Sequence, residues 1–265
     1  MENNKLSLLL NSGKKDLLSI YVTAGYPSLN DTGEIIIDCE KSGVDLMEIG
    51  IPFSDPLADG PVIQQSGQQA LDNGMTLKLL FEQLLGIKTS VKMPLLLMGY
   101  YNSILQFGAE KFCKRCREVG VSGLIIPDLP LTIFNSELKE LFEQYGLHHI
   151  LLITPQTSED RILEIDQHST AFIYAVSSAS TTGSRSGISD STAFLEKLEK
   201  MKLKQPILTG FNINNRDAYL HVCKHTRGAI IGSAFIKAIS EKGSTEKNIH
   251  AYLKSILKDD HTING

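Results

Sequence analysis

Eight short apolar runs, most of them followed by a longer amphipathic stretch, constrain the fold more than any other feature of this chain. The runs cover residues 19–23, 46–51, 95–101, 123–127, 150–154, 171–175, 207–210 and 229–232. Unbroken apolar runs of this length are typical of buried parallel strands. Strands that alternate with helices form a parallel sheet covered by helices, and eight such units close a barrel. The pattern therefore predicts an α/β protein with a (β/α)8 TIM barrel.

The stretches between the runs carry helix start and stop signals. Capping residues stand near the start of most of them, and glycine follows several. The expected helices cover residues 30–42, 75–89, 109–119, 132–145, 158–168, 191–201, 214–225, 233–241 and 245–258. An extra N-terminal helix at residues 5–11 precedes the first strand, and we expect it to cover the bottom of the barrel.

The length of the chain and its uniform composition indicate one folding unit. The 265 residues are ordinary for one barrel, and no linker-like boundary or low-complexity segment interrupts them. We therefore expect residues 1–265 to form a single domain. The alternative fold is an open doubly wound sheet, which shows the same alternation without closure.

Charge and composition argue against several classes of partner. The net charge is −4 and the basic residues are scattered, which argues against a nucleic-acid partner. Residues 1–16 lack a signal-peptide h-region, and the other apolar stretches have the length of strands, so we expect neither export nor a membrane partner. Cys113 and Cys116 lie in an expected helix, and the sequence offers no second cysteine pair to complete a four-ligand zinc site. The four cysteines thus indicate a structural role, no metal site and a reducing cytoplasm.

A carboxylate stands inside the second apolar run. Strand alternation places Leu46, Glu48 and Gly50 on one face. An unpaired buried charge is very costly, and no Arg or Lys stands at a comparable strand position, so we expect Glu48 to face the barrel lumen. Burial raises the pKa of a carboxyl group and suits it for proton transfer near neutral pH. The alternative is a structural role in which Glu48 bridges to a neighbouring barrel residue.

The loop after this run, residues 52–61, holds Asp55 and Asp59 among three prolines. A stiff loop at the carboxyl end of a barrel strand can present a side chain to the active site. Asp-Pro and Asp-Gly are also ordinary turn dipeptides. For Asp55 and Asp59 the residues alone leave both interpretations open.

Two turns late in the chain are suited to bind a phosphate. Gly232 and Ser233 stand at the head of an expected helix after the eighth run, where backbone N–H groups are free, and Gly210 with Phe211 follows the seventh run. Phosphate sites in barrels often form from these two loops. A simple helix-capping serine is the alternative at Ser233.

The segment after the sixth run, residues 177–190, is rich in Ser, Thr and Gly and favours a mobile lid over an inert surface loop.

None of the seven histidines follows an expected strand; His148 and His149 precede the fifth run. This placement argues against histidine catalysis and against a histidine-rich metal site.

A set of specific motifs stands in order along the whole chain. The most specific is P-F-S-D-P-L-A-D-G-P at residues 52–61, directly after the Glu48 run. Others are Y-V-T-A-G-Y-P at 21–27, Y-Y-N at 100–102, P-D-L-P at 127–130, T-P at 154–155, T-G at 182–183, G-F at 210–211 and G-S-A at 232–234. Together these motifs resemble the tryptophan synthase alpha subunit family.

The resemblance implies a (β/α)8 lyase of tryptophan biosynthesis that cleaves indole-3-glycerol phosphate to indole and glyceraldehyde 3-phosphate. It implies Glu48 as general acid/base and Asp59 as the partner of the indole N–H. It further implies substrate contacts from Tyr100, Tyr174, Thr182 and Phe211, and phosphate contacts from Gly183, Gly210, Gly232 and Ser233. Tyr21 falls where the family often has phenylalanine, and we leave it outside the expected site.

By the same resemblance, no cofactor is expected in this chain. The expected partner is a beta subunit that carries pyridoxal phosphate, in a heterotetramer of two alpha and two beta chains. The sequence departs from the family at Asn212, Ser178 and Ser180, in the phosphate turn and the lid. The alternatives are a stand-alone indole-glycerol-phosphate lyase and a weakly active chain that acts as an allosteric partner of the beta subunit.

Overall fold

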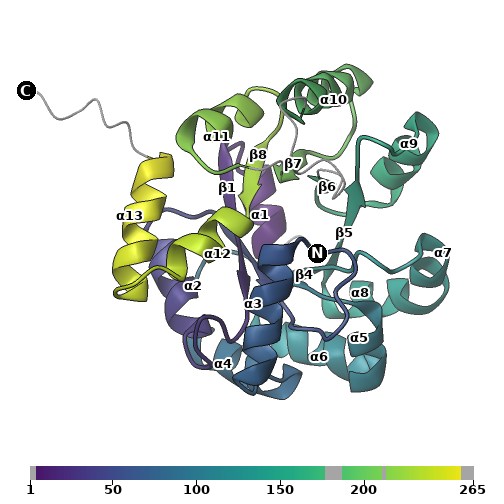
Figure 1. Cartoon of the computed structure of the whole chain (residues 1–265). Helices are drawn as coiled ribbons and strands as arrows, with labels where there is room; N and C mark the ends of the chain where they lie inside the picture. Colours follow the sequence, from purple (N-terminus) through teal and green to yellow (C-terminus); the bar gives the residue numbers. More distant parts are fainter. Residues whose placement is uncertain (1–3, 177–186, 211–212, 258–265) are drawn as a thin grey trace, which may run out of the picture.

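A computed structural model describes residues 4–176, 187–210 and 213–257 of the chain. Eight parallel strands form a closed barrel in sequence order, with helices around it (Figure 1). The strands are β1 (Leu17–Thr23), β2 (Leu46–Gly50), β3 (Leu95–Met98), β4 (Val121–Ile125), β5 (His148–Ile153), β6 (Ile173–Val176), β7 (Ile207–Gly210) and β8 (Gly228–Ile231). Because β1 pairs with β8, the (β/α)8 prediction is confirmed and the open sheet is excluded.

The helices cover the outside of the barrel in nearly the predicted order. They are α1 (Lys5–Asn11), α2 (Thr32–Lys41), α3 (Pro61–Asp72), α4 (Leu77–Ile87), α5 (Tyr101–Phe107), α6 (Ala109–Val119), α7 (Leu131–Ile133), α8 (Lys139–Tyr145), α9 (Glu159–His168), α10 (Gly187–Met201), α11 (Arg216–Cys223), α12 (Ser233–Ile239) and α13 (Thr245–Leu257). A π-helical turn, η1 (Phe134–Leu138), joins α7 to α8, where the sequence predicted one continuous helix.

The sequence interpretation missed two helices near the carboxyl ends of β2 and β3. Helix α3 begins with Pro61, and its buried residues are the small Ser66, Gly67 and Ala70, so its apolar stripe is less evident in sequence than one of bulky buried residues. Helix α5 begins at Tyr101, inside the run that was assigned to the third strand. The strand β3 ends three residues earlier, at Met98.

The N-terminal helix closes the bottom of the barrel, as predicted. Asn4 caps α1 and its side-chain amide donates 2.8 Å hydrogen bonds to the carbonyls of Ser122 and Gly146. Leu6 of this helix is fully buried in an apolar cluster with lumen residues of the strands. The helix therefore fills one end of the lumen, and the other end is left for the site.

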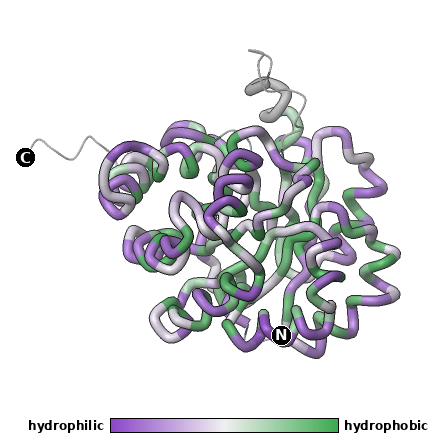
Figure 2. The backbone as a smooth tube through the Cα atoms, turned by 60° about the horizontal axis from the view of Figure 1, so that its bottom comes forward, coloured by the Kyte–Doolittle hydropathy of each residue, from purple (hydrophilic) through white to green (hydrophobic). Residues whose placement is uncertain are grey.

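Two apolar clusters, one inside the barrel and one between the strands and the helices, hold the fold together. Figure 2 shows the strands as mostly hydrophobic, with hydrophilic segments alternating along the surrounding helices.

Within the described ranges, no helix combines the length and the apolar character needed to cross a bilayer.

Candidate active site

The side chain of Glu48 lies inside the barrel, as strand alternation predicted. Glu48 pairs in register with Tyr21 of β1 and Leu96 of β3, and Leu96 belongs to the lumen cluster. Residues paired across parallel strands point to the same side of the sheet. Glu48 is therefore a lumen residue of β2, two positions before the strand ends at Gly50.

The carboxyl group of Glu48 is fully buried and holds one hydrogen bond among the described residues. The hydroxyl of Ser19 donates to Oε1 at 2.9 Å, while Oε2 has no partner among the described residues. No ion pair among the described residues includes Glu48, and its bridge to a neighbouring barrel strand is the hydrogen bond from Ser19. Because burial disfavours the charged form, the pKa of Glu48 is raised to about 8, and the Ser19 hydrogen bond opposes that shift.

A second carboxylate, Asp59, is held at the tip of the loop that follows β2. Its Oδ2 accepts a 3.0 Å hydrogen bond from the Tyr100 hydroxyl, and its backbone carbonyl accepts one of 2.8 Å from the Gln64 amide. Burial raises the pKa of Asp59, and the hydrogen bond from Tyr100 lowers it. Asp55, the other loop carboxylate, is exposed to solvent, which favours the turn interpretation for that residue.

Aromatic side chains line the space around these carboxylates. The ring of Tyr100 stacks on Phe53 with 5.0 Å between centroids. The hydroxyl of Tyr21 lies over Gly50, where a Cβ atom would overlap it. Any larger residue at position 50 would therefore displace the Tyr21 ring.

Two buried tyrosines link the carboxylates electrostatically. The pKa of Tyr174 is raised by burial and then by the charges of Glu48, Tyr21 and Asp59. The pKa of Tyr21 is likewise raised by burial and by Asp59 and Glu48. Both carboxylates therefore lie close enough to both phenols to shift their pKa values, and Tyr21 pairs with Glu48 in the β1–β2 register. Tyr21 and Ser19 were absent from the expected site, although both lie on the lumen face of β1 that alternation defines.

The predicted phosphate residues at the ends of β7 and β8 border the same space. A Cβ atom at Gly210 would lie 2.9 Å from the Tyr174 hydroxyl, and one at Gly232 would lie 3.5 Å from the Cβ of Tyr21. Gly232 precedes α12, whose first residue, Ser233, is exposed. The lack of side chains at both glycines keeps the backbone accessible beside the tyrosines.

Comparison with known proteins identifies the family. The model of the family "Tryptophan synthase alpha chain" matches residues 8–262. The chain belongs to the tryptophan synthase alpha chain family. An alpha chain from Flavobacterium psychrophilum is 56% identical over 241 residues, which cover 91% of this chain and 95% of that relative. One from Christiangramia forsetii is 54% identical over 96% of this chain and 98% of the relative.

Solved structures of alpha subunits share the fold. The subunit alpha from Legionella pneumophila superposes with a TM-score of 0.86 at 31% identity, over 96% of this chain and 97% of the other. The tryptophan synthase A-subunit of Pyrococcus furiosus gives a TM-score of 0.85 at 30% identity, over 92% and 98% of the two chains. The sequence resemblance to this family is therefore confirmed over most of the chain.

Part of the expected alpha-chain site lies outside the described residues. This holds for Thr182 and Gly183 in the predicted lid and for Phe211 after β7. The predicted lid was assigned to residues 177–190, but helix α10 already begins at Gly187. The end of that segment is therefore helical, which corrects the predicted helix start at residue 191.

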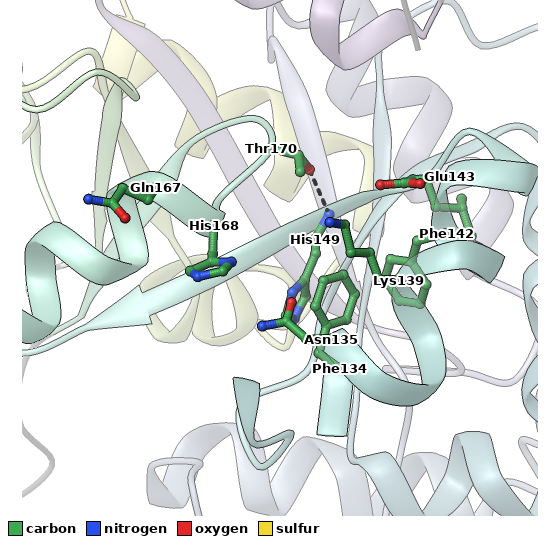
Figure 3. Close-up of a pocket in the computed structure, with 10 residues that line it drawn as sticks. Phe134, Asn135, Lys139, Phe142, Glu143, His149, Gln167, His168 and Thr170 are labelled. Carbon is green, nitrogen blue, oxygen red and sulfur yellow. Dashed lines mark hydrogen bonds between the residues drawn. The ribbon is translucent and has the colours of Figure 1, made fainter. Parts of the chain in front are cut away.

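A separate cavity of this alpha chain lies on the outer side of β5 (Figure 3). It has a volume of about 190 Å³ and is lined by residues of η1, α8 and α9 together with His149. The imidazole of His149 stacks on Phe134 with 3.9 Å between ring centroids, and burial lowers its pKa to about 4. Since His149 pairs with Leu124 and not with a lumen residue, this cavity does not belong to the Glu48 site.

Three side chains of metal-ligating types lie close together elsewhere among the described residues. Ligand atoms of Asp38, Glu246 and His250 lie within 4.8 Å of one another on the outer helices α2 and α13. The thiols of Cys113 and Cys116 are free and buried in α6. Neither group follows a barrel strand, where the predicted chemistry is located.

Proposed function

We propose that this chain performs the lyase reaction of its family at Glu48 and Asp59, the retro-aldol cleavage of indole-3-glycerol phosphate to indole and glyceraldehyde 3-phosphate. One observation carries the proposal: Glu48 is fully buried at the carboxyl end of β2, has one oxygen without a partner among the described residues, and has a pKa of about 8. A carboxyl group in this state can both give and take a proton at neutral pH.

Glu48 acts first as an acid and then as a base. Its neutral form donates a proton to C3 of the indole ring, and the ring nitrogen takes up the positive charge. The resulting carboxylate removes the proton of the adjacent glycerol hydroxyl. The carbon–carbon bond then breaks, the electron pair returns to the ring, and the aldehyde forms. Glu48 ends the cycle protonated, as it began.

Asp59 supplies the electrostatic stabilisation that this route requires. Positive charge develops on the indole nitrogen when C3 is protonated, and a carboxylate that accepts the N–H hydrogen bond stabilises it. The hydrogen bond from Tyr100 favours the charged form of Asp59 and fixes one of its oxygens. The rings of Tyr100 and Tyr174 supply apolar walls for the indole, with Phe211 and Thr182 as further substrate contacts.

The phosphate group is bound at the ends of β7 and β8. Gly210 and Gly232 expose backbone beside the buried tyrosines, and Ser233 begins α12. Backbone N–H groups at such a position attract an anion. Gly183 completes this set by family resemblance.

The proposed assembly is a heterotetramer of two alpha and two beta chains. The beta subunit consumes the indole with its pyridoxal phosphate, and we assign no cofactor to the alpha chain. We place the reaction in the cytoplasm, because the buried free thiols of Cys39, Cys113 and Cys116 fit a reducing compartment.

The test is indole release from indole-3-glycerol phosphate by the purified chain, alone and with the beta subunit from the same source. Slow release alone and a large increase on mixing support the proposal. Fast release that the partner does not change indicates a stand-alone lyase. No release in either case leaves a regulatory role and contradicts the proposal.

A further inference from the structure

A buried serine on β1 contacts the carboxyl group of Glu48. Ser19 is fully buried, and its hydroxyl donates to Oε1 of Glu48 at 2.9 Å. In the β1–β2 register Ser19 pairs with Leu46, so it lies one layer below Glu48 on the lumen face. Its partner on β8 is Ile230. Both lateral neighbours are apolar, so neither can replace the Ser19 hydroxyl as a donor to Glu48.

This contact makes the two oxygens of Glu48 unequal. Oε1 is occupied by a donor, whereas Oε2 is buried and has no hydrogen-bond partner among the described residues. A buried polar atom without a partner is costly and needs an explanation. A substrate group that exchanges a proton with Oε2 provides one, since it satisfies that oxygen when bound.

We propose that Ser19 is a positioning residue that fixes Oε1 of Glu48 and leaves Oε2 as the oxygen that exchanges protons with the substrate. The proposal rests on the proposed function of Glu48 and deepens it by naming the reactive atom.

The hydrogen bond from Ser19 serves both protonation states. When Glu48 is ionised, the hydroxyl stabilises the negative charge on Oε1. When Glu48 is neutral, Oε1 is the carbonyl oxygen and still accepts the same bond, so the acidic proton is located on Oε2. The donor thereby holds the carboxyl plane and directs the proton toward one side throughout the reaction.

Removal of the donor gives two measurable effects. Ser19→Ala deletes one oxygen atom and keeps the strand. The anion of Glu48 loses its stabilisation, so the pKa of Glu48 should rise by about one unit, the scale of a hydrogen bond to a charged group. The alkaline arm of the pH–rate profile should move up by the same amount. At pH 7 kcat should fall about tenfold, because the carboxyl group is no longer oriented.

The titration is measured directly by carbon-13 NMR of the glutamate carboxyl carbons, with the Glu48 signal identified by its absence in Glu48→Gln. Ser19→Thr keeps the hydroxyl and should titrate near the wild-type pH. Ser122→Ala removes another buried strand serine, which donates no bond to Glu48, and should leave the titration unchanged.

The proposal is supported by an upward shift in Ser19→Ala that Ser19→Thr restores. It is overturned if Ser19→Ala titrates like the wild type, or if Ser122→Ala shifts Glu48 equally. Because this titration needs no turnover, it separates the two proposals. A wild-type chain that releases no indole contradicts the proposed function, while the titration still reports whether Ser19 controls Glu48.

Discussion

The hydroxyl of Tyr100 donates a 3.0 Å hydrogen bond to Asp59 and accepts one of 2.9 Å from the backbone N–H of Ala58. One side chain at the end of β3 therefore holds the tip of the loop that follows β2. The ring also stacks on Phe53 of that loop. Asp59 thus depends on a residue that follows the next strand for its orientation.

Tyr100→Phe should lower kcat/KM for indole release about tenfold. The change removes a hydrogen bond to a charged group, worth roughly 1.5 kcal/mol, and keeps the stacked ring. The loss arises because Asp59 is no longer held in one orientation. Steady-state kinetics measures it, and circular dichroism should show an unchanged fold.

Tyr101→Phe is the matched control for this prediction. The Tyr101 hydroxyl lies 3.3 Å from Glu137, away from Asp59. This variant should retain nearly full activity. An equal loss in both variants would show that the Tyr100 contact to Asp59 has no special role.

Ser233→Asp should weaken substrate binding through charge repulsion with the phosphate. We expect KM to rise by about tenfold or more, since a carboxylate near a phosphate costs at least ~1.4 kcal/mol at close range. Ser244→Asp adds the same charge just before α13, where aspartate is a good N-cap, and should leave KM unchanged. An unchanged KM in Ser233→Asp would place the phosphate elsewhere.

Local patterns were sufficient to predict the barrel and the position of Glu48. Eight apolar runs gave the strand number, and alternation within β2 put Glu48 on the lumen face, because both features depend only on neighbouring residues. Helix α3 was missed since its buried residues Ser66, Gly67 and Ala70 are small, and its bulkier Val62 and Ile63 are only partly buried.

The sequence alone did not predict the hydrogen bonds that orient Glu48 and Asp59. The bond between Ser19 and Glu48 joins residues 29 positions apart, and it depends on the register of β1 against β2. The hydrogen bond between Tyr100 and Asp59 depends on the end of β3 at Met98. The apolar run continues to residue 101, so the sequence did not predict that end. Such contacts form only when the barrel closes, so patterns among neighbouring residues do not predict them.

Glu48→Gln should abolish cleavage and stabilise the protein at alkaline pH. The folded pKa of about 8 lies above the unfolded value of 4.5, so the fold favours the protonated carboxyl. That contribution is complete below pH 4.5 and is lost as pH rises to about 8. Above pH 8 the buried charge costs up to a few kcal/mol, which a neutral amide avoids.

Thermal unfolding of both proteins between pH 5 and 9 measures this effect. The Tm of Glu48→Gln should exceed that of the wild type at pH 9, and the difference should shrink toward pH 5. Glu34→Gln removes an exposed carboxylate of α2 and should show no such trend. A difference in Tm that is the same at every pH would contradict the raised pKa of Glu48.

His148 and His149 should destabilise the protein in mild acid. Burial lowers the pKa of each to about 4, below the unfolded value of 6.5. The unfolded chain therefore binds protons first as pH falls, and stability is lost progressively between pH 6.5 and about 4. Each imidazole contributes at most about 3 kcal/mol to this loss, because one pKa unit corresponds to 1.36 kcal/mol.

His149→Phe isolates the contribution of one of these side chains. Phenylalanine keeps the stack on Phe134 and has no proton to bind, so the free energy of unfolding should fall less steeply between pH 6.5 and 4 than in the wild type. Urea unfolding at several pH values measures the slope. His250→Gln removes an exposed imidazole of α13 and is the control for the loss of an imidazole outside the barrel. If His149→Phe retains the wild-type slope, the acid sensitivity arises from His148, which bridges Ser7 and Thr170 at the bottom of the barrel.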